Sequence, residues 1–172
     1  MRPADVLDAE AVFEAVDGAR ESLAPWLPWV DDWRGPADAG AFLRDTVQLS
    51  AEYKARYVSL WLDERAVGMA CLDPIDVAQR SASVGWWLIP SARGRGLATR
   101  AAAALITDAF ERVRLARVEA RMVADNRTSV AVAERLGMTR EGVLRAARVR
   151  RGVLNDVAVY SVLADEWAAL SP

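Results

Sequence analysis

The segment from Trp86 to Phe110 constrains the fold more than any other part of the chain. A short apolar run ends at Pro90, a loop with two arginines and two glycines follows at 93–96, and an uninterrupted helix-forming stretch begins near Ala98. This order predicts a buried strand, a tight loop and the first turn of a helix. Because the first amide groups of a helix lack partners and its dipole is positive there, the junction is suited to bind an anion.

Three interpretations of this loop remain open from the residues alone. Gly94 and Gly96 allow a sharp turn and close approach of the backbone, so that amides from the loop, with Arg93 and Arg95, would bind a diphosphate. The second interpretation is an ordinary strand-to-helix connection whose arginines only keep it soluble. A dinucleotide-binding loop is disfavoured because Thr99 stands where the third glycine of G-x-G-x-x-G belongs, and a P-loop is excluded because no G-K-[ST] occurs.

The hydrophobic patterns predict an α+β, or mixed α/β, single domain over residues 1–172. Helices are expected at about 4–17, 36–54, 98–113 and 126–137, and strands at about 56–62, 67–73, 81–90 and 117–123, with two more around a turn at Gly152. Strands on both sides of the long helix predict one right-handed crossover inside a mostly antiparallel sheet. Three prolines between Leu23 and Asp38 argue against a regular helix in that segment.

Composition excludes several classes of function. The chain has no histidine and a single cysteine, Cys71, so an internal disulfide and a Ser-His or Cys-His nucleophile are excluded and no metal site is expected. No apolar run reaches the roughly 20 residues that a membrane span needs, and no signal-like segment follows Met1, so a cytoplasmic location without a membrane partner is expected. A net charge of -2 argues against a nucleic-acid partner.

The motifs resemble those of the GNAT acetyltransferases. The segment "RGRGLA" is similar to the family's R/Q-x-x-G-x-G/A acyl-CoA signature, with Arg93, Gly96 and Ala98 at the defining positions. The segments "LPWV", "VGWWLIPSARGRGLAT", "NRTSVAVAERLGMTREGVLR" and "GVLNDVAVYSVL" are similar to the RimJ/RimL branch, which acetylates protein N-termini and related amines. The resemblance spans nearly the whole chain in the family's order. It implies the GNAT fold, a central twisted sheet flanked by helices, although the first ten residues leave almost no room for the usual first strand.

The resemblance implies acetyl-CoA as the cofactor, bound mainly by backbone groups. Its diphosphate would bind the loop and helix start, formed by Arg93, Gly94, Arg95, Gly96, Leu97, Ala98 and Thr99. A strand opened by a bulge at "GWWLI" would direct the N–H groups near Leu88 and Ile89 toward the pantetheine arm and the thioester carbonyl. Such amides would stabilise the oxyanion without a special side chain.

The resemblance also implies catalytic roles for two residues of "NRTS". Asn126 would contact the cofactor arm, although its role as a helix N-cap explains it equally well. Ser129 would lie near the sulfur and donate a proton to the departing thiolate after direct attack by an unprotonated amine, while Cys71 is expected to pack. Some relatives carry acids where Arg148 and Ser83 stand here. Asp156 is the substitute base, acting through water, or else it caps a turn.

The acceptor site of the family is lined by the region that contains Trp26, Trp29, Asp31, Asp32 and Trp33 here. The tryptophans would form a wall or stack on a cation, and the aspartates would attract an amine. At least one tryptophan is expected to pack against the sheet instead, and exposed tryptophans would suit a homodimer.

A protein N-terminus, as in ribosomal proteins, is the acceptor that the resemblance favours. An α-amino group has a pKa near 7.7–8.0, against about 10.4 for lysine, so it arrives deprotonated more often. The alternatives are a small amine, such as an amino acid, a polyamine or an antibiotic, and a non-catalytic acyl-CoA-binding module.

Overall fold

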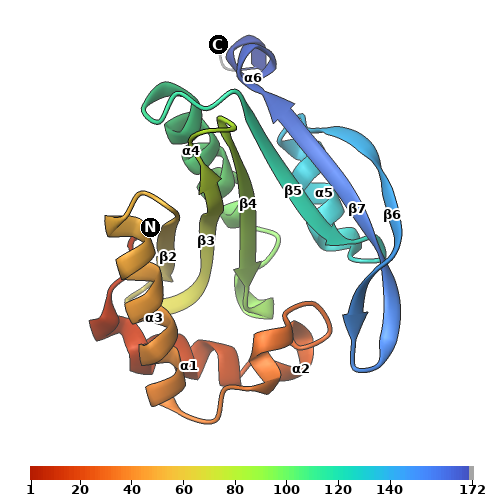
Figure 1. Cartoon of the computed structure of the whole chain (residues 1–172). Helices are drawn as coiled ribbons and strands as arrows, with labels where there is room; N and C mark the ends of the chain where they lie inside the picture. Colours follow the sequence, from red (N-terminus) through yellow and green to blue (C-terminus); the bar gives the residue numbers. More distant parts are fainter. Residues whose placement is uncertain (171–172) are drawn as a thin grey trace.

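The computed structural model describes residues 1–170, which form one seven-stranded sheet with helices on both faces (Figure 1). The strands are β1 (Arg2–Pro3), β2 (Arg56–Leu62), β3 (Arg65–Asp76), β4 (Ser81–Leu88), β5 (Arg117–Val123), β6 (Thr139–Arg150) and β7 (Val153–Leu163). Their order is β1-β2-β3-β4-β5-β7-β6, and only the β4–β5 pair is parallel. The predicted mixed α/β class and the single parallel crossover are confirmed.

The helices follow the predicted order, with short additions in the proline-rich segment. They are η1 (Val6–Asp8), α1 (Ala9–Asp17), α2 (Arg20–Leu23), η2 (Pro28–Asp31), α3 (Pro36–Ala51), η3 (Pro90–Ala92), α4 (Leu97–Glu111), α5 (Arg127–Arg135) and α6 (Ala164–Leu170). Prolines at the first position of η2 and α3 fit there because that position needs no N–H donor. The N-terminus, expected to have almost no room for a strand, forms a strand of only two residues, which pairs with β2.

Two hydrophobic cores lie on opposite faces of the sheet. Helices α1 and α3 bury Val12, Val16 and Leu43 on one face. On the other face, α4 and α5 cover Leu72 and Val118. Each fully buried side chain of this kind contributes roughly 1.5–3 kcal/mol to folding. No helix within residues 1–170 combines the length and hydropathy needed to cross a bilayer.

Strands β4 and β5 diverge soon after their pairing begins. The parallel ladder joins only Ser81–Ser83 to Arg117–Glu119, whereas β5 pairs with β7 along its whole length. The predicted opening of this strand is therefore present. The bulge was expected at "GWWLI" in β4, but β4 pairs regularly with β3 from Val84 to Leu88. The extra residue belongs to β3 instead, between Leu72 and Ile75. Pro74 lies in that interval and has no N–H to donate to the ladder.

Candidate active site

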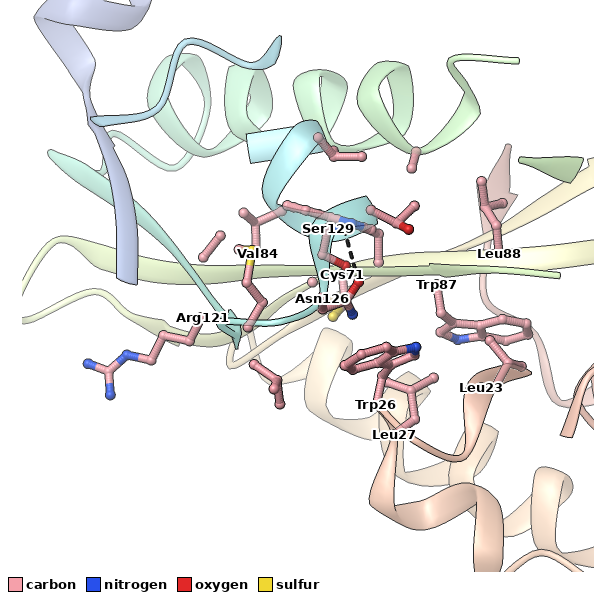
Figure 2. Close-up of a pocket in the computed structure, with 18 of the residues that line it drawn as sticks. Leu23, Trp26, Leu27, Cys71, Val84, Trp87, Leu88, Arg121, Asn126 and Ser129 are labelled. Atoms are coloured by element: carbon pink, nitrogen blue, oxygen red, sulfur yellow. Dashed lines mark hydrogen bonds between the residues drawn. The ribbon is translucent and has the colours of Figure 1, made fainter. Parts of the chain in front are cut away.

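A cavity of about 530 Å³ occupies the opening between β4 and β5 (Figure 2). Its walls come from the α2–η2 segment, the facing parts of β3, β4 and β5, the start of α5 and one residue of β6. Tryptophans and aliphatic side chains form much of the lining. The polar residues are Cys71, Asp73, Arg93, Arg121, Asn126, Thr128, Ser129 and Arg148.

The loop before α4 presents a run of unpaired amides beside this cavity. Gly94 and Gly96 have φ values of 74° and 71°, a conformation that costs other residues about 1–2 kcal/mol. Within residues 1–170, the N–H groups from Gly94 to Thr99 donate to no protein acceptor, whereas Arg100 N–H donates to the Gly96 carbonyl at 3.0 Å. Consecutive donors at the positive end of α4 are therefore available to a ligand.

The two loop arginines differ in position. The Arg93 guanidinium donates to the Leu88 carbonyl from Nε at 3.2 Å and from Nη2 at 3.1 Å, and it lines the cavity. This contact ties the loop to the end of β4. Arg95 is exposed and does not line this cavity, although its amide belongs to the unpaired run.

The end of β4 directs alternate amides toward the opening. Ile89 N–H donates to the Val67 carbonyl at 2.9 Å, so the prediction that this amide is free for the pantetheine arm is wrong. Only every second residue of an antiparallel strand exchanges hydrogen bonds with a given neighbour. The N–H groups of Leu88 and Trp86 therefore point away from β3 and toward the cavity. The sequence analysis missed the amide of Trp86.

Asn126 and Ser129 come together at the start of α5. Asn126 Oδ1 accepts a hydrogen bond from Ser129 N–H at 3.1 Å, which is the expected N-cap. Both residues also line the cavity, as does Cys71, and Figure 2 draws all three. In the same view the guanidinium of Arg121 points away from this group, and its Nε donates to Glu119 at 2.7 Å.

Asp156 lies outside the cavity lining and is exposed. Its Oδ1 accepts the N–H of Ala146 at 2.8 Å, where Ala146 has a φ of 53° in the irregular part of β6. Of the two roles considered for Asp156, the structure supports capping of an irregular backbone segment and gives no support to a catalytic base.

The tryptophans near the N-terminus divide between the cavity and the core. Trp26 and Trp29 are half-buried and line the cavity, whereas Trp33 is buried in the α1–α3 core with its ring 4.6 Å from that of Trp29. None of the seven tryptophans, all within the described residues, is exposed. The argument for a homodimer from exposed tryptophans therefore has no structural basis.

The aspartates that were expected to attract an amine do not face the cavity. Asp31 accepts hydrogen bonds from Arg150 and Arg151, each at 2.7 Å. The bond from Arg151 has the larger effect, and together they hold the pKa of Asp31 well below its usual value. Asp32 is exposed and absent from the lining. The predicted steering of the acceptor by these two carboxylates is not supported.

Asp73 is the cavity's carboxylate among the described residues, and the sequence analysis missed it. Its Oδ2 accepts a short hydrogen bond from the Tyr57 hydroxyl. Burial, and then this bond, raise the pKa of Tyr57 far above its usual value, so the phenol stays protonated. An Asp-Pro pair inside an apolar strand was the available signal, because proline interrupts the ladder there.

Cys71 lines the cavity and is half-buried, whereas the sequence analysis expected it to pack in the interior. Burial, and next the charge of Asp73, raise the pKa of the Cys71 thiol to about 12. The thiol is therefore protonated near neutral pH and is a poor nucleophile.

Comparison with known proteins identifies the family. The sequence matches the acetyltransferase (GNAT) domain family over residues 1–139. It is 32% identical over 165 residues to the putative ribosomal N-acetyltransferase YdaF of Bacillus subtilis, covering 93% of this chain and 88% of that relative. The ribosomal-protein-serine acetyltransferase of Escherichia coli is 26% identical over 139 residues, 81% of this chain and 78% of the relative. Mycobacterium smegmatis RimJ, solved in complex with CoA-disulfide, matches with a TM-score of 0.87 and 26% identity, covering 96% of this chain and 81% of that one. The chain therefore belongs to the GNAT acetyltransferase family and is RimJ/RimL-like.

Proposed function

We propose that this protein transfers the acetyl group of acetyl-CoA to an α-amine at a protein N-terminus. Two relatives, named as a putative ribosomal N-acetyltransferase and a ribosomal-protein-serine acetyltransferase, support a protein acceptor. The observation that carries the proposal is the run of N–H groups from Gly94 to Thr99, which have no acceptor among residues 1–170 and lie beside the cavity. We further propose that residues 1–172 act as a single domain in the cytoplasm.

The backbone N–H groups that are free among the described residues are the proposed binding groups for acetyl-CoA. The amides of Gly94–Thr99 would bind the diphosphate, with the positive end of α4 adding to the attraction. The amides of Trp86 and Leu88 would bind the pantetheine arm along the free edge of β4. Acetyl-CoA supplies an activated thioester, and RimJ has been solved with a CoA disulfide. Asn126 and Ser129 would then lie near the reacting end.

Two residues are proposed to move protons. Asp73 would accept the proton that the attacking amine loses as its nitrogen bonds to the acetyl carbon, while Tyr57 orients the carboxylate. Ser129 would donate a proton to the sulfur as the carbon–sulfur bond breaks. No acyl-enzyme is needed. Cys71 is an unsuitable carrier because the pKa of its thiol is about 12.

A small amine is the second candidate acceptor. The half-buried Trp26 and Trp29 form part of the cavity wall, and a walled cavity of about 530 Å³ suits a compact molecule. A protein N-terminus needs an open path for the chain that follows the first residues. The two candidates therefore differ in the length of acceptor that the site accepts.

Release of free thiol from acetyl-CoA separates these functions. The acceptors are a set of N-terminal peptides, the same peptides with a blocked α-amine and an internal lysine, and small amines. Turnover confined to free α-amines of peptides supports the proposal, whereas turnover confined to small amines favours the second candidate. Tight acetyl-CoA binding with no thiol release on any acceptor would identify a non-catalytic acyl-CoA-binding module.

A further inference from the structure

Arg148 is the cavity arginine that has no protein partner among the described residues. Arg93 is held by the Leu88 carbonyl, and Arg121 by the carboxylate of Glu119. Arg148 is half-buried and lines the same cavity, yet it forms no hydrogen bond or ion pair within residues 1–170. A guanidinium that is partly removed from water without a partner is costly, and an anionic ligand would offset that cost.

The Arg148 side chain lies at the end of the cavity away from α4. It pairs with Asn155 in the regular ladder that also contains Arg150, so the two arginine side chains lie on the same face of β6. Arg150 Nε donates to the carbonyl of Ala24 at 2.6 Å, in the segment that carries Trp26. Arg148 therefore faces the side of the cavity walled by α2 and η2, opposite the diphosphate loop.

Two carboxylates, one in the η2 wall and one on the strand paired with β6, are engaged elsewhere. Asp31 is paired with Arg150 and Arg151. Asp156, across the irregular part of β6, accepts the N–H of Ala146. Neither Asp31 nor Asp156 forms an ion pair or a hydrogen bond with Arg148.

Asp73 supplies the opposite charge in the same cavity. Its partner Tyr57 packs against the α1–α3 core, with its ring 5.7 Å from Phe42, so Asp73 lies on the same face of the sheet as the α2–η2 wall. A carboxylate and an unpaired guanidinium thus line one cavity whose remaining wall is largely aromatic and aliphatic. This arrangement is complementary to a molecule that carries both an amine and an anion.

We propose that Arg148 is a specificity residue that selects an acceptor with a carboxylate close to its reacting amine, namely an N-terminal peptide with Asp or Glu near its first residue. The inference rests on the proposed function, and it narrows the acceptor class. The guanidinium would bind the peptide carboxylate through paired N–H donors, while Asp73 faces the amine. A charge-assisted hydrogen bond of this kind corresponds to about tenfold in kcat/KM or more.

Paired peptides test this assignment. One peptide begins Ser-Glu and the other Ser-Gln, with identical neutral residues afterwards, and both are assayed with the wild type, Arg148→Gln, Arg148→Lys and Arg145→Gln. Arg145 lies on the same strand but is exposed and outside the cavity lining, which makes it the matched control. The wild type and Arg145→Gln are expected to prefer the Glu peptide by about tenfold. Arg148→Gln loses that preference, and Arg148→Lys keeps part of it.

Other outcomes overturn the inference. These are an unchanged peptide ratio in Arg148→Gln, a higher KM for acetyl-CoA with the ratio intact, and a preference for free glutamate over both peptides. If the wild type acetylates no peptide, the proposed function fails, and calorimetry with the two peptides decides the inference separately. Tighter binding of the Glu peptide to the wild type than to Arg148→Gln supports the anion site, and equal binding contradicts it.

Discussion

Arg150 and Asp31 lie 119 residues apart in the sequence and form an ion pair of 2.7 Å. The Arg150 guanidinium also donates to the carbonyl of Ala24, and Arg151 donates to the same aspartate. These contacts fasten the tip of the β6–β7 hairpin to the α2–η2 segment. The segment that walls one end of the cavity is therefore held by a strand from the opposite end of the chain.

Replacement of Asp31 by Asn is expected to loosen this attachment. Loss of the carboxylate weakens three charge-assisted hydrogen bonds, so amides near the hairpin tip and in the α2–η2 segment should exchange with deuterium faster than in the wild type. Added salt should produce part of the same effect in the wild type, because the Arg151 side chain is 60% exposed and its pairing with Asp31 is screened. Asp32→Asn is the matched control and should exchange like the wild type. Equal exchange in the two variants would show that the ion pair does not hold the segment.

Gly96→Ala is expected to weaken acetyl-CoA binding. Gly96 has a φ of 71°, and an added Cβ would lie 2.9 Å from Nη1 of Arg100. A conformational cost of about 1–2 kcal/mol would move the loop away from the arrangement in which its amides are directed at one ligand. Calorimetry should give a dissociation constant about tenfold higher for acetyl-CoA. Gly142→Ala introduces a Cβ with no atom within 4 Å and should bind like the wild type. Equal affinities for Gly96→Ala and the wild type would remove the loop from cofactor binding.

Ser129→Ala is expected to lower kcat while the KM for acetyl-CoA stays close to the wild-type value. The hydroxyl would protonate the departing sulfur, and general acid catalysis contributes at most about 10²–10⁴-fold. The loss of kcat should be at the lower end of this range, since a thiolate is a good leaving group without protonation. Ser129→Thr retains a hydroxyl and should recover part of the rate. Steady-state turnover that is the same for Ser129→Ala and the wild type would exclude the proton donor role.

Asp73→Asn is expected to lower kcat/KM for an α-amine by about 10²–10⁴-fold near neutral pH. The deficit should shrink as the pH rises through the amine pKa of about 7.7–8.0, because more of the acceptor then arrives deprotonated. Tyr57→Phe keeps the carboxylate and loses its hydrogen-bond donor, so a smaller loss is expected. A pH–rate profile for the three proteins measures this, and a deficit of constant size across the range would argue against Asp73 as the base.

Glu141→Gln is expected to reduce stability at neutral pH but not at low pH. A hydrogen bond from Arg117, and next one from Ser161, lower the pKa of Glu141 to about 2. Since the folded pKa lies below the ordinary value of 4.5, the carboxylate stabilises the fold above pH 4.5 and loses that contribution as the pH falls toward 2. The side chain is 40% exposed, so the difference should be no more than about 1 kcal/mol.

Urea unfolding at several pH values measures this difference. Glu14→Gln, in an exposed part of α1 with no ion pair among the described residues, is the control and should show little pH dependence relative to the wild type. If the Glu141→Gln difference persists at pH 2, the Arg117 pair is not its cause.

Local sequence signals were sufficient for the element order and for the loop. Pro90, Gly94 and Gly96 act through their own backbone preferences, so the junction before α4 could be predicted without knowledge of the rest of the chain. The turn at Gly152 is of the same kind, with a φ of 77°. The class of fold followed from the hydrophobic patterns, and the strand–loop–helix junction followed from these positions.

Features that depend on strand register could not be predicted in this way. Whether Leu88 or Ile89 faces the opening depends on which residue of β3 each one meets, and the sequence of β4 alone does not specify that. The bond between Tyr57 and Asp73 joins two strands, and the pairing of Asp31 with Arg150 joins distant segments. The Asp-Pro pair marked a break in the strand, but the partners of Asp73 and Asp31 depend on tertiary contacts that no local pattern specifies.

The central claim is that main-chain amides before α4 bind the diphosphate of coenzyme A. Nuclear magnetic resonance of ¹⁵N-labelled protein, titrated in parallel with acetyl-CoA and with pantetheine, which lacks the diphosphate, tests it most directly. Saturating acetyl-CoA should shift the N–H signals of Gly94–Thr99, and pantetheine should leave those signals in place. Unchanged signals at saturating acetyl-CoA, or shifts of the same size with pantetheine, would contradict the account.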